Sequence, residues 1–208
     1  GRRCWTIQYA DGAQFHMDIL PTIPEETVFI ESLKGIGIPA EWAKYAICLT
    51  DKTFWNYDQY DDDWPRSNPR GYASWFKERM KVQYTARRKM IADSMRAGIE
   101  DVPEYLVKTP LQRSIQLLKR HRDIAFLDDP DNRPISIIIT TLAALAYNNQ
   151  ADLIEALTDI VKQMPKYIKR TNGIVQILNP VNPNENFAEK WQENPDKETK
   201  FMAWMIKV

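Results

Sequence analysis

The hydrophobic pattern of the chain changes its period part of the way along, and this change limits the fold more than any other feature. Apolar and polar residues alternate at residues 5–9 and 15–20, which is typical of strands. Asp11-Gly12 lies between these two runs and favours a hairpin turn. After about residue 70, apolar residues recur every three or four positions, which indicates helices. The sequence therefore predicts an α+β fold with a strand-containing beginning and a mostly helical remainder.

The segments with the helical period are residues 71–95, 111–126, 135–147, 151–164 and 196–208. Pro134 precedes the third of these and suits a first helical turn, where its missing N–H group has no partner to lose. Residues 174–178 predict a short strand or a buried turn. Residues 179–187 are rich in proline and asparagine and predict a rigid loop. Residues 25–55 are mixed, with one or two helical turns expected at 39–45.

The composition fits an ordinary globular chain. Its 208 residues suit one large domain or two small ones. The 28 basic side chains balance the 28 acidic ones, so the net charge gives no argument for nucleic acid or a membrane surface as partner. The two cysteines are too few for a disulfide framework and favour a reducing cytosol. No run of about 18 or more apolar residues is present, so we expect no membrane span.

Both ends of the sequence favour a piece of a larger protein. The chain begins with Gly1, and strand-like residues follow within a few positions. The predicted helix at residues 196–208 runs to the last residue with no capping glycine or asparagine. We therefore expect that further sequence precedes and follows these residues.

Asp18 is the first candidate for chemistry. It lies in a strand-like run, on the face opposite Phe15, Met17 and Ile19. Two-metal phosphoryl transfer needs carboxylates gathered around cations about 3.5–4 Å apart, and strands hold such groups rigidly. The alternative is a solvated aspartate on the exposed face of a hairpin.

The predicted helix at residues 111–126 is dense in cations. Arg113, Lys119 and Arg122 are expected on a face that can hold a triphosphate by charge-assisted hydrogen bonds. The alternative is a basic face that water solvates. His121 is expected at the surface or at the helix end, because no second histidine or cysteine lies at metal-ligand spacing.

Ser136 is expected in the first turn of the next helix. Free backbone N–H groups at a helix start attract anions, so a phosphate group would fit there. The alternative is a core helix with a capping hydroxyl. The acidic run at residues 61–63 lies between aromatics and prolines, and it favours a solvated loop over a metal site.

Four segments together resemble the CD-NTases, the bacterial relatives of cyclic GMP–AMP synthase and oligoadenylate synthetase. The segments are Tyr9-Ala10-Asp11-Gly12 with residues 15–21, Ser67-Asn68-Pro69-Arg70-Gly71-Tyr72-Ala73 with Trp75-Phe76, the two predicted helices at 111–123 and 135–144, and Asn179-Pro180-Val181-Asn182-Pro183 with residues 185–187 and Lys190-Trp191. The resemblance covers nearly the whole chain, and it depends on the order and spacing of these segments.

This resemblance implies a polymerase-β-like nucleotidyltransferase core, with its remainder at residues 1–60, and a helical C-terminal lobe at residues 61–208. Such enzymes join nucleoside triphosphates into cyclic di- or trinucleotides and release pyrophosphate, with Mg²⁺ as cofactor and Mn²⁺ as an alternative. The expected substrates are ATP, GTP or pyrimidine triphosphates. The resemblance also implies anti-phage signalling in the bacterial cytoplasm, with regulatory proteins of CBASS systems as candidate partners and with neither a membrane nor nucleic acid as partner.

Carried over residue by residue, the resemblance gives three site residues. Asp18 matches the third metal-binding carboxylate, which also helps to activate the attacking ribose hydroxyl. Lys119 matches the lysine that grips the triphosphate, and Ser136 matches the serine that assists it. These roles are expectations from the family.

The chain departs from the family pattern in one respect. A Gly-Ser motif and an Asp-x-Asp pair precede the Asp18 strand in the family, and nothing in these 208 residues matches either one. We therefore expect that these residues alone do not catalyse. The alternatives are a non-catalytic module that binds a nucleotide or oligonucleotide through Arg113, Lys119 and Arg122, and a purely structural helical domain.

Overall fold

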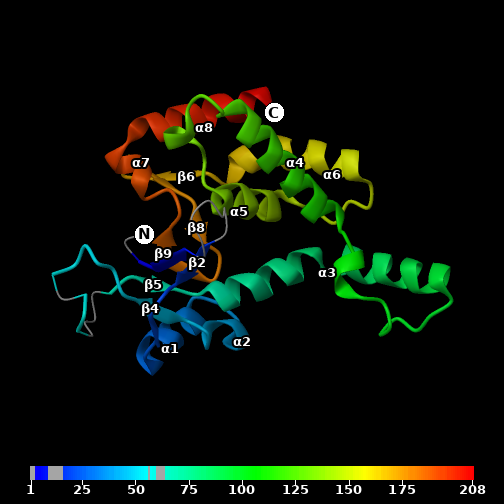
Figure 1. The fold of residues 1–208 in the computed structure, drawn as a ribbon, viewed down its shortest axis with the longest axis horizontal. Coiled ribbons are helices and arrows are strands. Elements are labelled where there is room, and N and C mark those ends of the chain that lie inside the picture. Colours follow the sequence, from blue (N-terminus) through cyan, green and yellow to red (C-terminus); the bar gives the residue numbers. More distant parts are fainter. Residues whose placement is uncertain (1–2, 9–15, 56, 60–63) are drawn as a thin grey trace. The chain divides into compact units, whose positions relative to one another are not determined.

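The computed structural model describes residues 3–8, 16–55, 57–59 and 64–208, which form two compact units (Figure 1). The first unit comprises Gly1–Trp75 with Pro180–Glu185, and the second comprises Phe76–Asn179 with Asn186–Val208. Small antiparallel sheets and helices share the first unit, whereas helices dominate the second. The predicted α+β fold class is confirmed. The assignment of a catalytic core to residues 1–60 and a lobe to 61–208 stays a prediction.

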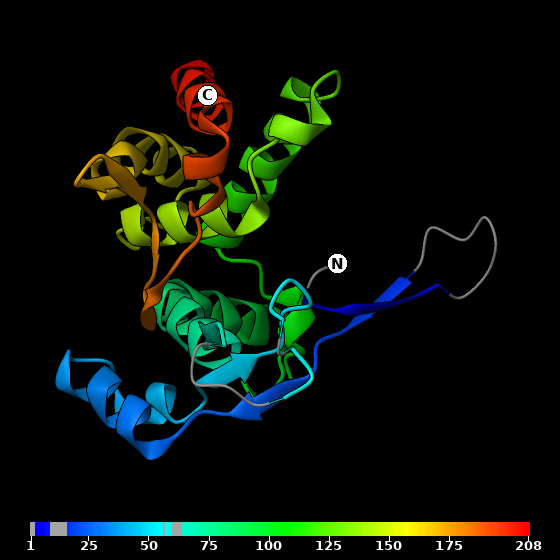
Figure 2. The ribbon, with the colours of Figure 1, turned by 90° about the vertical axis from the view of Figure 1, so that its left-hand side faces the viewer.

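The strands of the first unit form two small antiparallel sheets. One sheet is β1 (Trp5–Gln8) with β2 (His16–Ile19), and the other is β3 (Thr22–Pro24), β4 (Ile47–Leu49) and β5 (Arg66–Ser67) in that order. Figure 2 shows β1 and β2 side by side as a narrow ribbon. The predicted turn at Asp11-Gly12 lies outside the described residues, as does the acidic run at 61–63.

The alternation predicted for the first two strands is confirmed, but their apolar face is not in a core. Trp5 pairs with Ile19 and Ile7 with Met17, so these four side chains share one face of the ribbon. Their exposed fractions are 55%, 45%, 44% and 43%, respectively. The described part of the chain therefore leaves this face open.

The helices of the first unit are α1 (Thr27–Gly35) and α2 (Ala40–Ala43), and α3 (Pro69–Met95) begins in this unit and continues into the second. Leu33, Ala43 and Ala46 form a small buried cluster beneath α1 and α2. The mixed pattern at residues 25–55 did not predict the helix α1. Its nine residues bury only Leu33 fully, which leaves too short an apolar stripe to stand out.

Besides the remainder of α3, the second unit contains the helices α4 (Pro110–Ala125), α5 (Ser136–Ala146), α6 (Leu153–Gln163) and α8 (Pro195–Lys207) and the short helix α7 (Lys190–Glu193). Its strands are β6 (Lys169–Thr171), β7 (Ile174–Gln176) and β8 (Leu178–Asn179). The strand β9 (Asn182–Asn186) lies mostly within Pro180–Glu185, the segment that belongs to the first unit. The helices α4, α5 and α6 pack on one another. Leu111, Leu118, Ile138 and Leu142 are among their fully buried side chains.

Local signals explain where these helices begin and end. Thr109 starts α4 with a capping box, in which its hydroxyl accepts from the Gln112 N–H group and the Gln112 amide oxygen accepts from the Thr109 N–H group. At the C-terminal end of α5, Arg79 of α3 donates to the Ala144 carbonyl at 2.7 Å and also to the Tyr147 carbonyl. A cation at this end also suits the helix dipole.

Two predicted boundaries are wrong. Pro134 is not in the first turn of α5, because the helix begins at Ser136 and Ile135 is an extended N-cap residue with φ −69° and ψ 146°. Residues 179–187 are not simply a loop, because β9 lies within them. The Asn186 side chain explains this second case, since it donates to the Val175 carbonyl at 2.8 Å and accepts from the Ile177 N–H group at 3.0 Å.

Among the residues described, no helix has both the length and the apolar character needed to cross a bilayer.

Candidate functional site

A pocket of about 490 Å³ lies in the second unit, at the junction between α4 and α5. Its walls are the end of α4, the loop that leads to α5, the first turn of α5, and residues near α7 and α8. The lining residues are Arg122, Pro130, Asp131, Asn132, Arg133, Pro134, Ile135, Ser136, Phe187, Lys190, Trp191 and Lys197. Four of these side chains are cations and one is a carboxylate, so the pocket favours an anionic ligand.

Ser136 is the first residue of α5, as predicted, and it is exposed at the pocket. The N-cap residue Ile135 has no side-chain oxygen to cap the helix. The Ser136 carbonyl accepts from the Thr140 hydroxyl at 2.8 Å, one turn further along α5. The start of α5 therefore presents a hydroxyl and first-turn N–H groups at the positive end of an 11-residue helix.

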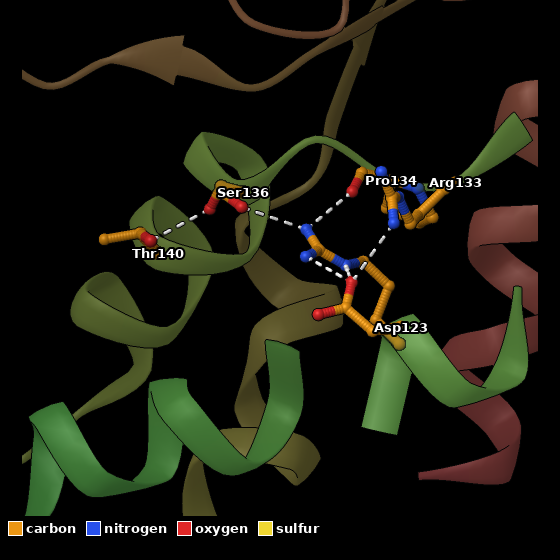
Figure 3. A network of polar contacts seen from close by, with 6 residues as sticks. Asp123, Arg133, Pro134, Ser136 and Thr140 are labelled. Atoms are coloured by element: carbon orange, nitrogen blue, oxygen red, sulfur yellow. Dashed lines mark hydrogen bonds and ion pairs between the residues drawn. The ribbon is translucent and has the colours of Figure 1, made fainter. Parts of the chain in front are cut away.

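Arg122 links the end of α4 to the start of α5. Its Nη1 group donates to the Pro134 carbonyl at 2.9 Å and to the Ser136 hydroxyl oxygen at 3.0 Å. Its Nε and Nη2 groups donate to Oδ1 of Asp123 at 3.0 and 2.7 Å. Arg133 lies 3.6 Å from the same carboxylate oxygen. Figure 3 shows Asp123, Pro134 and Ser136 gathered in this network.

The cationic face predicted on α4 is wrong for Arg122. Arg122 is only 7% exposed, because it continues the buried stripe of Ile115 and Leu118 at helical spacing. Arg113 precedes it by nine residues, which is about two and a half turns, so the two side chains point to opposite sides of α4. The three predicted cations therefore do not share one face.

Lys119 lies one turn before Arg122 and Asp123 on α4, and it is half-buried. Burial lowers the pKa of its ammonium group below the ordinary value, and the nearby charge of Arg122 lowers it further. The carboxylate of Asp123 opposes this change. Lys119 is not among the described residues that line the pocket, although it and Ser136 both neighbour Arg122.

Sequence reasoning missed Arg133, Lys190 and Lys197 as pocket residues. Arg133 lies in the loop directly before Pro134, and its side chain is 48% exposed. Lys190 and Lys197 come from the start of α7 and the first turn of α8. Lys197 donates to the Asp131 carbonyl, which ties α8 to the loop. Sequence periodicity gave no signal for these cations, because they meet only through tertiary packing.

Asp18 belongs to the first unit, on β2 opposite Thr6 of β1. The Thr6 hydroxyl donates to Oδ1 of Asp18 at 2.6 Å, and His16 Nε2 lies 4.0 Å from Oδ2. The hydrogen bond from Thr6 is the largest cause that holds the Asp18 pKa below its ordinary value. Asp18 is therefore an exposed carboxylate that stays ionised at neutral pH.

The described residues do not form a metal cage around Asp18. No group of three or more His, Cys, Asp or Glu side chains that can hold a metal ion occurs among residues 3–8, 16–55, 57–59 and 64–208. One carboxylate falls short of the ligand set that two divalent cations require.

His121, Trp191 and Trp204 pack against other side chains of the second unit, whereas Trp5 and Trp55 of the first unit are exposed. The indole Nε1 group of Trp204 donates to Nδ1 of His121 at 2.9 Å. Trp191 packs on Phe201 with ring centroids 5.2 Å apart, and Trp191 and Trp204 are buried. His121 itself is exposed and lies in the last turns of α4, in agreement with the expectation that it lies at the surface near the helix end.

Two proteins of related sequence align with almost the whole chain. A c-di-GMP synthase of Roseivirga ehrenbergii is 35% identical over 205 residues, which are 98% of this chain and 48% of that protein. The cyclic dinucleotide synthase CdnG of Bradyrhizobium diazoefficiens is 23% identical over 216 residues, which cover 96% of this chain and 47% of that protein. The chain thus spans about half the length of these relatives.

A solved structure has the same fold. The structure of the Bradyrhizobium diazoefficiens CD-NTase CdnG in complex with GTP matches 100% of this chain and 58% of its own chain, with a TM-score of 0.66 and 20% identity. At this identity, the likeness concerns the fold alone. No protein-family model matches the chain.

Proposed function

The chain belongs to the CD-NTase family, and from this premise we propose that it is part of an enzyme that joins nucleoside triphosphates into a cyclic dinucleotide and releases pyrophosphate. The observation that carries this proposal is the 35% identity with a c-di-GMP synthase over 98% of the chain. The name of that relative supports GTP as the substrate and c-di-GMP as the product. The complex of the structural relative with GTP supports the same substrate.

The pocket at the start of α5 is our candidate site for the triphosphate. Its 490 Å³ volume suits a small ligand, and it combines the start of α5 with the Ser136 hydroxyl and several cations. Arg133 and Lys190 are both exposed and line the pocket, so their charged groups can bind the phosphate oxygens of a ligand there. Lys119, on the turn of α4 before Arg122, is a further candidate for phosphate binding, because it matches the triphosphate-binding lysine of the family.

Asp18 is proposed to be one of several metal-binding carboxylates in the full-length protein, with Mg²⁺ or Mn²⁺ as the ion. We propose that the 208 residues alone do not catalyse. The support for this is that the described residues provide no cluster of metal ligands. The wider role in anti-phage signalling in the bacterial cytoplasm, with CBASS regulators as partners, rests on family membership alone.

The proposed reaction is tested by following product formation. The full-length protein is incubated with radiolabelled GTP and a divalent cation, and the products are treated with phosphatase and separated. We expect a phosphatase-resistant product from the wild type, and its loss from Asp18→Asn, because the amide removes a negative charge that the metal needs. Asp128→Asn, which changes an exposed aspartate of the second unit, is the matched control and should keep the product.

Three results would each contradict a part of the proposal. A full-length protein that binds GTP but forms no resistant product would favour a nucleotide-binding module without catalysis. Equal activity in Asp18→Asn and in the wild type would remove Asp18 from the catalytic site. Product formed by the 208 residues alone would contradict the proposal that they do not catalyse by themselves.

A further inference from the structure

The Arg122 side chain is almost fully committed to contacts within the protein. It is 7% exposed, and its four hydrogen bonds to Asp123, Pro134 and Ser136 use four of the five N–H groups of the guanidinium. Only one N–H group of the guanidinium is therefore left to bind a ligand directly. Arg122 therefore affects ligand binding in the pocket mainly by holding Pro134 and Ser136 in position.

The contact with Ser136 limits the directions that the hydroxyl proton can take. A serine hydroxyl has one proton to donate and lone pairs that accept. Because the Ser136 oxygen accepts from Nη1 of Arg122 at 3.0 Å, one lone pair is occupied and its proton remains available. In the described part of the chain, no acceptor takes that proton. Ser136 is exposed at the pocket, so the proton is free for an anionic ligand there.

The other contacts hold Arg122 in place. The Asp123 carboxylate accepts two hydrogen bonds from Arg122 and lies 3.6 Å from Arg133, so its charge is shared between two guanidinium groups. The Pro134 carbonyl accepts from the same Nη1 group that contacts Ser136. The end of α4 and the start of α5 are thereby fixed to one planar group, whose fork geometry a lysine ammonium does not reproduce.

We propose that Arg122 is a positioning residue that orients the Ser136 hydroxyl toward a phosphate group of the bound nucleotide. This inference rests on the proposed function, because it places a triphosphate in the pocket. Arg122 thus has a different role from Ser136 and Lys119, which are proposed to contact the ligand directly. Arg122 acts on the nucleotide only through Ser136 and the loop that carries it.

A double-mutant cycle on the full-length protein tests the inference. The affinity for a GTP analogue with a non-hydrolysable α,β bond is measured by calorimetry in the wild type, Arg122→Lys, Ser136→Ala and the double variant. Loss of a hydrogen bond to a charged group weakens binding by about tenfold or more, so each single change should do so. In the Ser136→Ala background, Arg122→Lys should cost at least about fivefold less than it does alone.

Controls separate this role from charge and from folding. Arg120→Lys changes an exposed cation on the same helix and should leave the affinity within about twofold of the wild-type value. Thermal unfolding of each variant shows whether it folds. If Arg122→Lys does not fold, Asp123→Asn replaces it in the cycle, because it releases the anchor of the same guanidinium.

The outcomes distinguish the two proposals. Strong coupling between the two positions supports the positioning role. If the wild type binds the analogue and the two changes simply add, the inference is wrong while the proposed function stands. If the folded wild type binds no GTP analogue, the proposed function fails and the inference fails with it.

Discussion

Gly71 and Asn68 show how much a single residue can fix at the start of α3. The Asn68 side chain accepts from the Gly71 N–H group at 2.9 Å and donates to the Trp42 carbonyl at 3.0 Å. Asn68 is fully buried, so it cannot move aside. A Cβ atom added at Gly71 would lie 2.5 Å from the Asn68 amide atoms. The short motif Asn68-Pro69-Arg70-Gly71 therefore needs glycine at its last position.

Gly71→Ala should destabilise the full-length protein by about 1–3 kcal/mol, because the methyl group overpacks a buried amide. Gly35→Ala is the matched control, since nothing lies within 4 Å of the added Cβ atom and Gly35 ends helix α1. Alanine favours a helix, so this control should be neutral or stabilising by up to about 1 kcal/mol. Urea unfolding followed by circular dichroism measures both. Equal stabilities of the two variants would contradict the steric argument.

At the scale of elements, α6 depends on a charged cap. The Asp152 carboxylate accepts from the N–H groups of Ile154 at 2.8 Å and Glu155 at 3.0 Å. These hydrogen bonds, with that of Glu155 as the largest cause, hold the Asp152 pKa below its ordinary value of 3.8. Because the folded state favours the ionised form, the stabilisation is complete above the ordinary pKa and is lost as the pH falls through the lowered pKa.

Asp152→Asn should remove this part of the acid sensitivity while keeping a helix cap, because asparagine caps well but does not ionise. The stability difference between the wild type and this variant should be constant at neutral and mildly acidic pH. It should shift in favour of the variant once the pH falls below about 3.8. Unfolding measured across this range checks the prediction. Parallel stability curves for the two proteins at all pH values would show that the Asp152 charge does not stabilise α6.

How well the sequence predicted each element follows from where its stabilising contacts lie. The helices α3 to α6 and α8 were predicted because their apolar stripes, and for α4 the capping box at Thr109, are local in the sequence. The strand β9 was missed because proline and asparagine disfavour strands. Asn186 contacts Val175 and Ile177, which only the folded chain brings to it. Periodicity cannot reveal such contacts.

The candidate site was predictable in part for the same reason. Ser136 was found because a helix start is a local feature. Arg122 was expected on a cationic face that holds a triphosphate or is solvated by water, although its spacing from Ile115 and Leu118 already put it in the buried stripe. Lys190 and Lys197 reach the pocket from elements that follow α5 by more than 40 residues. Their convergence depends on the packing of the second unit.

At the scale of the whole molecule, the chain has the CD-NTase fold, and its second unit holds a cationic pocket at the start of the apolar helix α5. The first unit presents Asp18 on a two-stranded sheet with few buried side chains. We propose that the second unit binds the phosphate groups and that Asp18 of the first unit is one metal-binding carboxylate. The nucleotide is proposed to bind at the first turn of α5.

Hydrogen exchange of the full-length protein, measured by mass spectrometry with and without the non-hydrolysable GTP analogue, tests this claim most directly. A phosphate bound at a helix start occupies its free N–H groups and slows their exchange. We expect slower exchange in peptides that cover residues 130–140 and 187–197, and no change in the C-terminal half of α3, which does not line the pocket. Protection confined to other segments, with the start of α5 unchanged on saturation with the analogue, would contradict it.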